Sequence, residues 1–322
     1  MQVRLSLKWL AAAAAFTASA TFAQTWPTKP ITVVMPYAAG GPTDLVTRKV
    51  AQRMSESIGQ PVIVVNAPGA STMIGAERVA RAPSDGYTLL VGSVTTFSNN
   101  PLMYKNIRYK IEDFVPISMM AYTPYTLSIN PALPIKSFAQ FVEYAKSHSG
   151  KMFNATTGVG ATNQLLSQIL GNELGVKFVE VPYKGSGPAL VDVMGGQVDM
   201  TYDGIATSVQ PHRTGKVRVI AVTSEKRSTA LPDVPTFAEL GYPKMTAAFW
   251  YGLFAPTGTP SAIIEKLNVE LNAALRADDI RSQLEGTGLT VDPGTPQVLA
   301  ATIRRDAQAW GPIIKSLGIE LE

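Results

Sequence analysis

Two short segments rich in glycine and hydroxyl groups carry the residue types that bind small anions. Each follows an apolar run and opens a helical pattern. The candidate ligand-binding residues in residues 37–44 are Tyr37, Ala39, Gly40, Gly41, Thr43 and Asp44, and those in residues 156–163 are Thr157, Gly160, Ala161 and Thr162. Glycine permits close approach of the backbone to a ligand, and the free N–H groups and positive dipole end of a helix attract anions. Both segments therefore predict binding of an anion such as a carboxylate. For the first, a tight turn stabilised by Asp44 is an equal alternative.

Two other strand-to-helix junctions add candidates. Tyr183, Lys184 and Ser186 lie in residues 182–188, and Asp203 stands at the end of a strand pattern. Lys184 could pair with an anion or be a solvated surface lysine. Asp203 could accept a hydrogen bond from a polar or cationic ligand group, or could stabilise the following turn. A bulky residue at Gly160 is expected to block backbone approach to the ligand and weaken binding.

Catalytic and metal-binding patterns find little support. The sequence has no cysteine, and His148 and His212 are its two histidines. A nucleophile elbow fails because Lys184 stands where a glycine must precede Ser186, and a dinucleotide fingerprint fails because Asn163 replaces its third glycine. We expect no catalytic residue, metal or cofactor. The alternative is an exported hydrolase of a carboxylate ester or amide that uses one of the two histidines as base.

The elements that must position these loops form two α/β sets followed by helices. Apolar runs predict strands at 31–35, 62–65 and 87–91, alternating with helices at 43–58 and 74–80, which favours a parallel sheet. The second set has strands at 125–129, 152–155, 178–181, 198–202 and 217–222, and helices at 137–145, 163–174 and 189–194. A strand at 249–255 and two helices, 261–275 and 296–317, follow. Capping-box patterns occur at 137–140 and 236–239.

The junctions between the two sets are apolar rather than rich in glycine and serine. Residues 115–129 and 247–254 are predicted to be extended segments that pass from one domain to the other and back. The expected organisation is a first lobe from 24–124, a second lobe from 125–248, and a return to the first lobe from 249–322, with a cleft between the lobes.

Length and composition are consistent with an exported protein of about two domains. The chain has 322 residues, of which 46% are hydrophobic and 16% charged. Residues 1–23 have the basic start, apolar stretch and small residues of a signal peptide, with cleavage expected after Ala23 or alternatively Ala20. Removal of Arg4 and Lys8 lowers the formal net charge from +4 to +2, which is not a nucleic-acid signature. We expect a periplasmic monomer without a membrane span or a nucleic-acid partner.

An ordered set of motifs resembles the Bug-type, TctC-like solute-binding proteins of tripartite tricarboxylate transporters. The motifs are WPTKPI at 26–31, AGGPTD at 39–44, NAPGA at 66–70, PSDGYTL at 83–89, VPYKGS at 181–186, GGQVD at 195–199, AVTS at 221–224 and LPDVPT at 231–236. The resemblance implies a periplasmic, type II Venus-flytrap protein that carries a di- or tricarboxylate, an amino acid or an aromatic acid to a membrane permease. It also implies that loops from both lobes hold the ligand. Ser93 and Thr96 support the first loop, and Tyr183, Lys184, Ser186 and Asp203 line the cleft.

The chain departs from the family pattern in its second loop. Val159, Ala161 and Gln164 stand where asparagine, threonine and histidine are common, and Gly204 stands where asparagine is common. The loop changes remove polar groups from the expected pocket, so the sequence does not define the part of the ligand beyond its carboxylate. Nearby aromatic residues could favour an aromatic or long apolar acid, or could be core and crossing-strand residues; they are Tyr37, Phe97, Tyr122, Tyr125 and Trp250. The sequence does not separate transport from presentation of ligand to a signalling partner.

Overall fold

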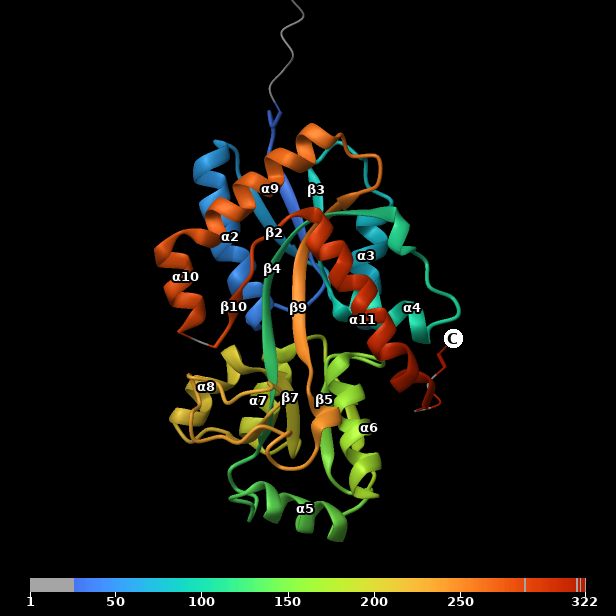
Figure 1. Ribbon diagram of the computed structural model, residues 1–322, viewed down its shortest axis with the longest axis vertical. Coiled ribbons are helices and arrows are strands. Elements are labelled where there is room, and N and C mark those ends of the chain that lie inside the picture. The colour runs from blue at the N-terminus through green and yellow to red at the C-terminus, as the bar shows by residue number, and fades with distance from the viewer. Residues whose placement is uncertain (1–25, 287, 317, 319, 322) are drawn as a thin grey trace, which may run out of the picture.

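The computed structural model describes residues 26–286, 288–316, 318 and 320–321, and it has two α/β lobes (Figure 1). The mixed α/β fold agrees with the predicted class. The predicted signal peptide and its cleavage site lie outside the described residues. No helix in the described part of the chain is long and apolar enough to cross a membrane.

The first lobe is built on a sheet with the order β2-β1-β3-β9-β4. Strands β1 (Ile31–Met35), β2 (Val62–Asn66) and β3 (Thr88–Ser93) are parallel. The apolar runs of β1 and β3 are largely buried because helices cover both faces of the sheet, whereas the edge strand β2 buries Val62 and exposes Ile63. The helices of this lobe are α2 (Pro42–Ile58), α3 (Met73–Ala80), α4 (Asn100–Met103), α9 (Ser261–Arg276), α10 (Asp278–Glu285) and α11 (Pro296–Ser316). A π-helical segment, Thr95–Asn99, follows β3.

The second lobe is smaller and has its own sheet, in which β4 is followed by β7, β5 and β6. Its strands are β5 (Phe153–Thr156), β6 (Val179–Pro182), β7 (Met200–Gly204) and β8 (Arg218–Val222). Its helices are α5 (Phe138–Ser147), α6 (Thr162–Leu174), α7 (Ser186–Gly195) and α8 (Ile205–Arg213). Ser137 caps α5 by accepting the Gln140 N–H, as its capping-box pattern predicts.

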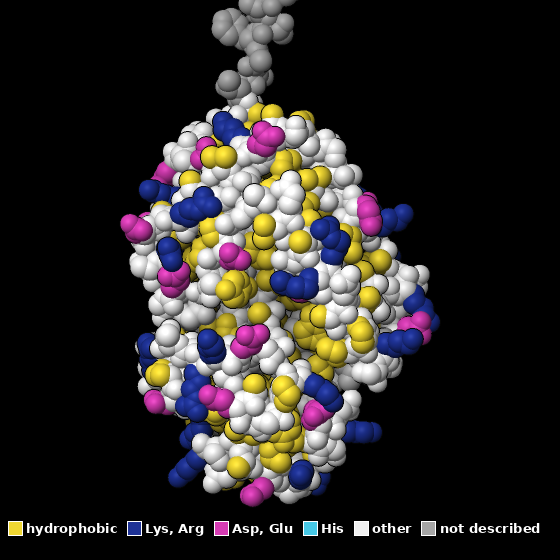
Figure 2. Space-filling model, in the orientation of Figure 1, with side chains coloured by type: hydrophobic (Ala, Val, Ile, Leu, Met, Phe, Trp, Pro, Cys, Tyr) yellow, Lys and Arg dark blue, Asp and Glu magenta, His cyan; other side chains and the backbone are white. Residues whose placement is uncertain are grey.

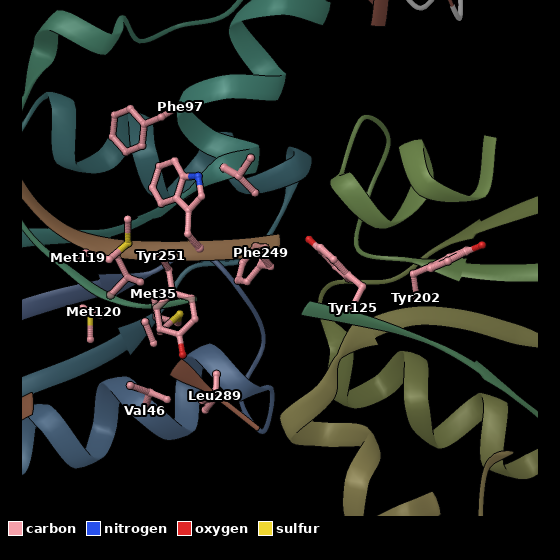
Figure 3. Close-up of a cluster of buried hydrophobic side chains, with 14 of the residues drawn as sticks. Met35, Val46, Phe97, Met119, Met120, Tyr125, Tyr202, Phe249, Tyr251 and Leu289 are labelled. Atoms are coloured by element: carbon pink, nitrogen blue, oxygen red, sulfur yellow. The ribbon is translucent and has the colours of Figure 1, made fainter. Parts of the chain in front are cut away.

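Two strands connect the lobes (Figure 1). Strand β4 (Phe114–Ile129) pairs with β9 (Ala248–Pro256) as far as Pro124, and from Tyr125 onward it pairs with β7 and β8. The junction predicted at 115–129 therefore lies within one strand of 16 residues, Phe114–Ile129. Figure 3 shows Phe249 and Tyr251 on the first-lobe side of this region, with Tyr125 and Tyr202 on the second-lobe side.

Three local predictions differ from the structure. Helix α8 was not predicted, because Pro211 inside it disrupts the helical pattern. The tail has three helices rather than two, since the short polar segment of α10 forms a helix whose buried Ile280 and Leu284 lie four residues apart. The reciprocal bonds of a capping box do form between Thr236 and Glu239, but they close a turn and no helix follows.

Candidate functional site

A narrow cavity of about 40 Å³ lies between the lobes. The residues that line it come from both lobes and from both connecting strands. From the first lobe they are Tyr37, Ala38, Gly41, Thr43, Asp44 and Thr95, from the second lobe Thr157, Asn163, Ser186, Tyr202, Asp203 and Gly204, and from the connecting strands Tyr125 and Phe249. Because each lobe supplies only part of the wall, the cavity exists only while the lobes are together.

Four helices begin at this cavity. Gly41 is the N-cap of α2, Asn163 lies in the first turn of α6, Ser186 is the first residue of α7, and Gly204 is the N-cap of α8. The first N–H groups of a helix have no partner within it, and each helix start carries a partial positive charge of roughly half a unit. The four starts together create a positive potential that favours a bound anion.

The ionisable side chains at the cavity are acidic. Its described lining contains Asp44 and Asp203 but no lysine, arginine or histidine. Asp44 accepts hydrogen bonds from Arg48 Nε at 3.0 Å, Asn66 Nδ2 at 3.0 Å and the Gly40 N–H at 3.1 Å. Burial opposes ionisation of Asp44, but these hydrogen bonds outweigh it and lower its pKa. Asp44 therefore stays ionised and holds the Gly40 turn in place.

The carboxylate of Asp203 also has its hydrogen-bond donors within its own lobe. Its carboxylate accepts the Gly204 N–H at 2.8 Å and the Thr207 hydroxyl at 2.6 Å, so it fixes the start of α8. Burial raises its pKa above the usual value, although hydrogen bonds from Thr207, Ser186 and Gly204 oppose the shift. Asp203 thus has the turn-stabilising role that was its alternative interpretation, while also forming part of the cavity wall.

Aromatic rings form the wall beside the connecting strands. Phe249 makes edge contacts with Tyr37 at 6.2 Å and with Tyr125 at 5.9 Å between ring centroids. The Tyr37 hydroxyl lies 2.8 Å from Ser93 Oγ, and Ser93 Oγ lies 3.4 Å from Thr96 Oγ1. Burial raises the pKa of Tyr37 to about 12, so its hydroxyl keeps its proton. This wall offers an apolar surface next to the helix starts.

Direct hydrogen bonds join the lobes around the cavity, and we call this set the latch. The Ala38 N–H donates to the Lys184 carbonyl at 3.0 Å, and Asn99 Nδ2 donates to Thr162 Oγ1 at 2.8 Å. The Val159 carbonyl accepts from the Tyr104 hydroxyl at 2.9 Å and from Ser71 Oγ. The structure is therefore a closed conformation held in part by contacts between the lobes.

The loop that carries Ser71 is strained. Ala70, Ser71 and Thr72 have φ values of 44°, 48° and 79°, which non-glycine residues rarely adopt. Backbone strain of this kind persists only where surrounding contacts over-determine it, and it concentrates at functional segments. Here it lies where the first lobe contacts the second.

Some of the residues predicted from the sequence lie at the cavity and others do not. Those that line it are Tyr37, Gly41, Thr43, Asp44, Thr157, Ser186 and Asp203. Those outside its lining are Ala39, Gly40, Ser93, Thr96, Gly160, Ala161, Thr162, Tyr183 and Lys184. Ser93 and Thr96 lie behind Tyr37, as predicted supports of the first loop would. Lys184 and Thr162 belong to the latch.

Gly160 and Tyr183, both predicted to face the ligand, contact other parts of the protein in this structure. A Cβ at Gly160 would come within 2.6 Å of the Met103 side chain of the first lobe, so bulk there would oppose closure rather than block a ligand. The Tyr183 hydroxyl donates to Asp192 at 2.6 Å. Together with Lys184, Tyr183 lines a separate inter-lobe opening of about 330 Å³.

Several cavity residues were missed as candidates. They are Ala38, Thr95, Tyr125, Asn163, Tyr202, Gly204 and Phe249. Ala38 and Asn163 stand inside the two predicted loops, and helix-start geometry could have selected Asn163. Of the five aromatic residues considered, Tyr37 and Tyr125 reach the cavity and Phe97 is core. Tyr122 and Trp250 line a different groove.

The two histidines lie away from the cavity. His148 caps the end of α5, where its ring stacks on Tyr144 at 3.9 Å. His212 is half-buried at the end of α8, and its Nδ1 accepts the Val219 N–H at 3.2 Å. Burial lowers its pKa. Among the described residues no cluster of three His, Asp or Glu side chains could hold a metal.

The fold has two lobes, and residues from both lobes line the cavity between them. Residues 46–319 match the family described as the tripartite tricarboxylate transporter family receptor. The chain belongs to this family. Its relatives are periplasmic solute-binding proteins, and the chain is a solute-binding protein rather than an enzyme.

Solved structures agree with this assignment. The chain is similar to the periplasmic binding protein BugD, with 36% identity and a TM-score of 0.89 over 92% of this chain and all of that one. It is similar to Rpa4515 of R. palustris, solved with adipate, with 34% identity and a TM-score of 0.88 over 92% of this chain and all of that one. It is also similar to MatC of Rhodopseudomonas palustris, solved with malate, with 34% identity and a TM-score of 0.86 over 90% of this chain and all of that one.

Proposed function

We propose that the protein captures a small organic carboxylate in the periplasm and delivers it to the membrane permease of a tripartite tricarboxylate-type transporter. The observation that carries this proposal is the convergence of four helix starts on a cavity whose described lining has no cationic side chain. Such a site neutralises one carboxylate through backbone N–H groups. The adipate and malate bound by the similar proteins are carboxylates of this kind.

The ligand carboxylate is placed at the helix starts, next to Gly41, Thr43, Asn163 and Ser186. The remainder of the ligand lies against Tyr37, Phe249 and Tyr125. The small size of the cavity favours a compact acid, and the aromatic wall tolerates an apolar or aromatic portion. Di- and tricarboxylates, amino acids and aromatic acids remain the classes to test.

Export removes residues 1–23, leaving a monomer with a first lobe of residues 24–124 and 249–322 and a second lobe of residues 125–248. The change of β4 from pairing with β9 to pairing with β7 after Pro124 supports this division. Mass spectrometry of the protein recovered from the periplasm tests the cleavage after Ala23, and light scattering tests the monomer.

Isothermal titration against a panel of di- and tricarboxylates, amino acids and aromatic acids tests the binding function. The proposal expects one acid to bind with one site per chain. Absence of binding by every carboxylate in the panel would overturn it.

A further inference from the structure

A much larger hollow lies on the face of the connecting strands that is opposite the ligand cavity. It is a groove of about 900 Å³ that contacts both lobes, and Figure 2 shows hydrophobic side chains gathered where the lobes meet beside α11. We call it the rear groove. Its floor is formed by Met119, Tyr122, Pro124, Ala248 and Trp250, its first-lobe wall by Asp292, Val298, Thr302, Arg305, Asp306, Ala309, Trp310 and Ile313, and its second-lobe wall by Thr223, Ser224, Glu225, Lys244, Thr246 and Ala247.

The rear groove and the ligand cavity lie on opposite faces of the same two strands. In the β4–β9 ladder, Tyr122 pairs with Trp250, and Pro124 pairs with Ala248; all four line the rear groove. Phe249, between Ala248 and Trp250, lines the ligand cavity instead. Side chains alternate between the two faces of a strand. A rotation about these strands that separates the lobes at the cavity must therefore bring the walls of the rear groove together.

The two faces differ in how the lobes are joined. On the cavity side the latch supplies direct hydrogen bonds between the lobes. Across the rear groove, no hydrogen bond or ion pair connects the two walls among the residues that the structure describes. The hydrogen bonds of the groove lie on one side or the other: Trp250 Nε1 of the floor donates to Asp306 of the first-lobe wall, and within the second-lobe wall Thr223 Oγ1 donates to the Ala247 carbonyl at 2.6 Å.

We infer that the rear groove sets the resting balance between the open and closed forms of the protein. The latch favours the closed form on one side of the connecting strands, and the space in the groove permits opening on the other. Bulk added to a groove wall opposes narrowing of the groove, so it favours the closed cavity even without ligand. The inference uses the proposed function only in taking closure as the step that captures ligand.

Inter-lobe distances measured without ligand test this inference. Because the sequence has no cysteine, Leu45→Cys and Val191→Cys place two spin labels without competing thiols. Both positions are exposed, at 51% and 58%, on the first-lobe helix α2 and the second-lobe helix α7, whose starts face each other at the cavity. Their separation lengthens when the cavity opens.

The measurement is made in an Asn99→Ala background, in which loss of the Thr162 bond populates the open form. Ala309→Trp, on the first-lobe wall, is expected to raise the population of the short distance relative to that of the long distance by about threefold or more. Thr246→Trp, on the second-lobe wall, provides an independent wedge. Ala301→Trp is the matched control, since Ala301 is exposed on α11 and does not line the groove.

A result in which both wedge variants match Ala301→Trp, or shift toward longer distances, would overturn the inference. So would an Asn99→Ala protein with no increase in the long distance. Failure of every carboxylate to bind would affect the proposed function alone, because these distances are measured without ligand.

Discussion

Gly187→Ala should make the protein more stable and yet a weaker binder. Gly187 is the second residue of α7, and alanine within a helix is favoured over glycine by up to about 1 kcal/mol. An alanine Cβ at this position would lie 3.1 Å from the Ala39 carbonyl oxygen and 3.8 Å from the Gly40 carbonyl carbon. Both are backbone atoms of the opposite lobe, so they can yield only if the lobes move apart. The open form has no such contact.

The expected loss of ligand affinity in Gly187→Ala follows from this single close contact. A steric contact tighter than normal by a few tenths of an ångström costs about 1 kcal/mol in a packed interface, and only the closed form experiences it. This corresponds to about fivefold weaker binding. Thermal unfolding without ligand should meanwhile show a higher midpoint, because alanine favours the helix. A variant that merely folds poorly would lower both the ligand affinity and the unfolding midpoint, whereas Gly187→Ala is expected to lower only the affinity.

Gly195→Ala is the matched control, because Gly195 ends the same helix and a Cβ there would meet no atom within 4 Å. Calorimetric titration of both variants with the acid identified from the carboxylate panel decides the outcome. Equal affinities for the two variants would refute the claim that binding requires this close approach of α7 to residues 39–40.

Two further predictions concern charged residues. Lys184→Ala should change affinity by less than about twofold, because only the Lys184 carbonyl takes part in the latch and its side chain is exposed; a tenfold loss by calorimetry would restore Lys184 as an anion partner. Burial raises the pKa of Glu180 to about 7, although hydrogen bonds from Asn154 and Ser167 oppose the shift. The folded state therefore holds the proton of Glu180 more tightly than the unfolded state does. This contribution to the free energy of unfolding is fully present below about pH 4.5 and is lost as the pH rises through about 7. Glu180→Gln should remove this dependence and add about 2–3 kcal/mol at pH 8 in denaturant unfolding, whereas an unchanged pH profile would contradict it.

The sequence predicts most of the fold because its strands are continuous apolar runs and most of its helices have regular apolar spacing. Strands β1, β2 and β3 and the helices between them come from continuous apolar segments and regular helical spacing. The segments that were missed lack such signals. Helix α8 contains a proline, and α10 is short and polar.

The candidate site is predicted less completely, for a geometric reason. Loop composition locates Gly41, Thr157 and Ser186, but it does not show which atoms of a loop face the ligand and which face the other lobe. Lys184 and Thr162 have suitable chemistry and belong to the latch instead. Likewise, Phe249 and Trp250 are neighbours in β9, so their side chains lie on opposite faces of the strand. The sequence does not show which of these faces borders the cavity, and the structure places Phe249 there.

The central claim is that helix starts, rather than cationic side chains, hold a ligand carboxylate in the cavity. The direct measurement is calorimetric titration of the mature protein with the best acid of the panel and with its neutral primary amide. We expect the acid to bind with one site per chain and the amide to bind about 30-fold more weakly, since a partly buried helix-start interaction contributes up to about 2 kcal/mol. Equal affinity for the acid and the amide, or no binding by any acid, would contradict the account.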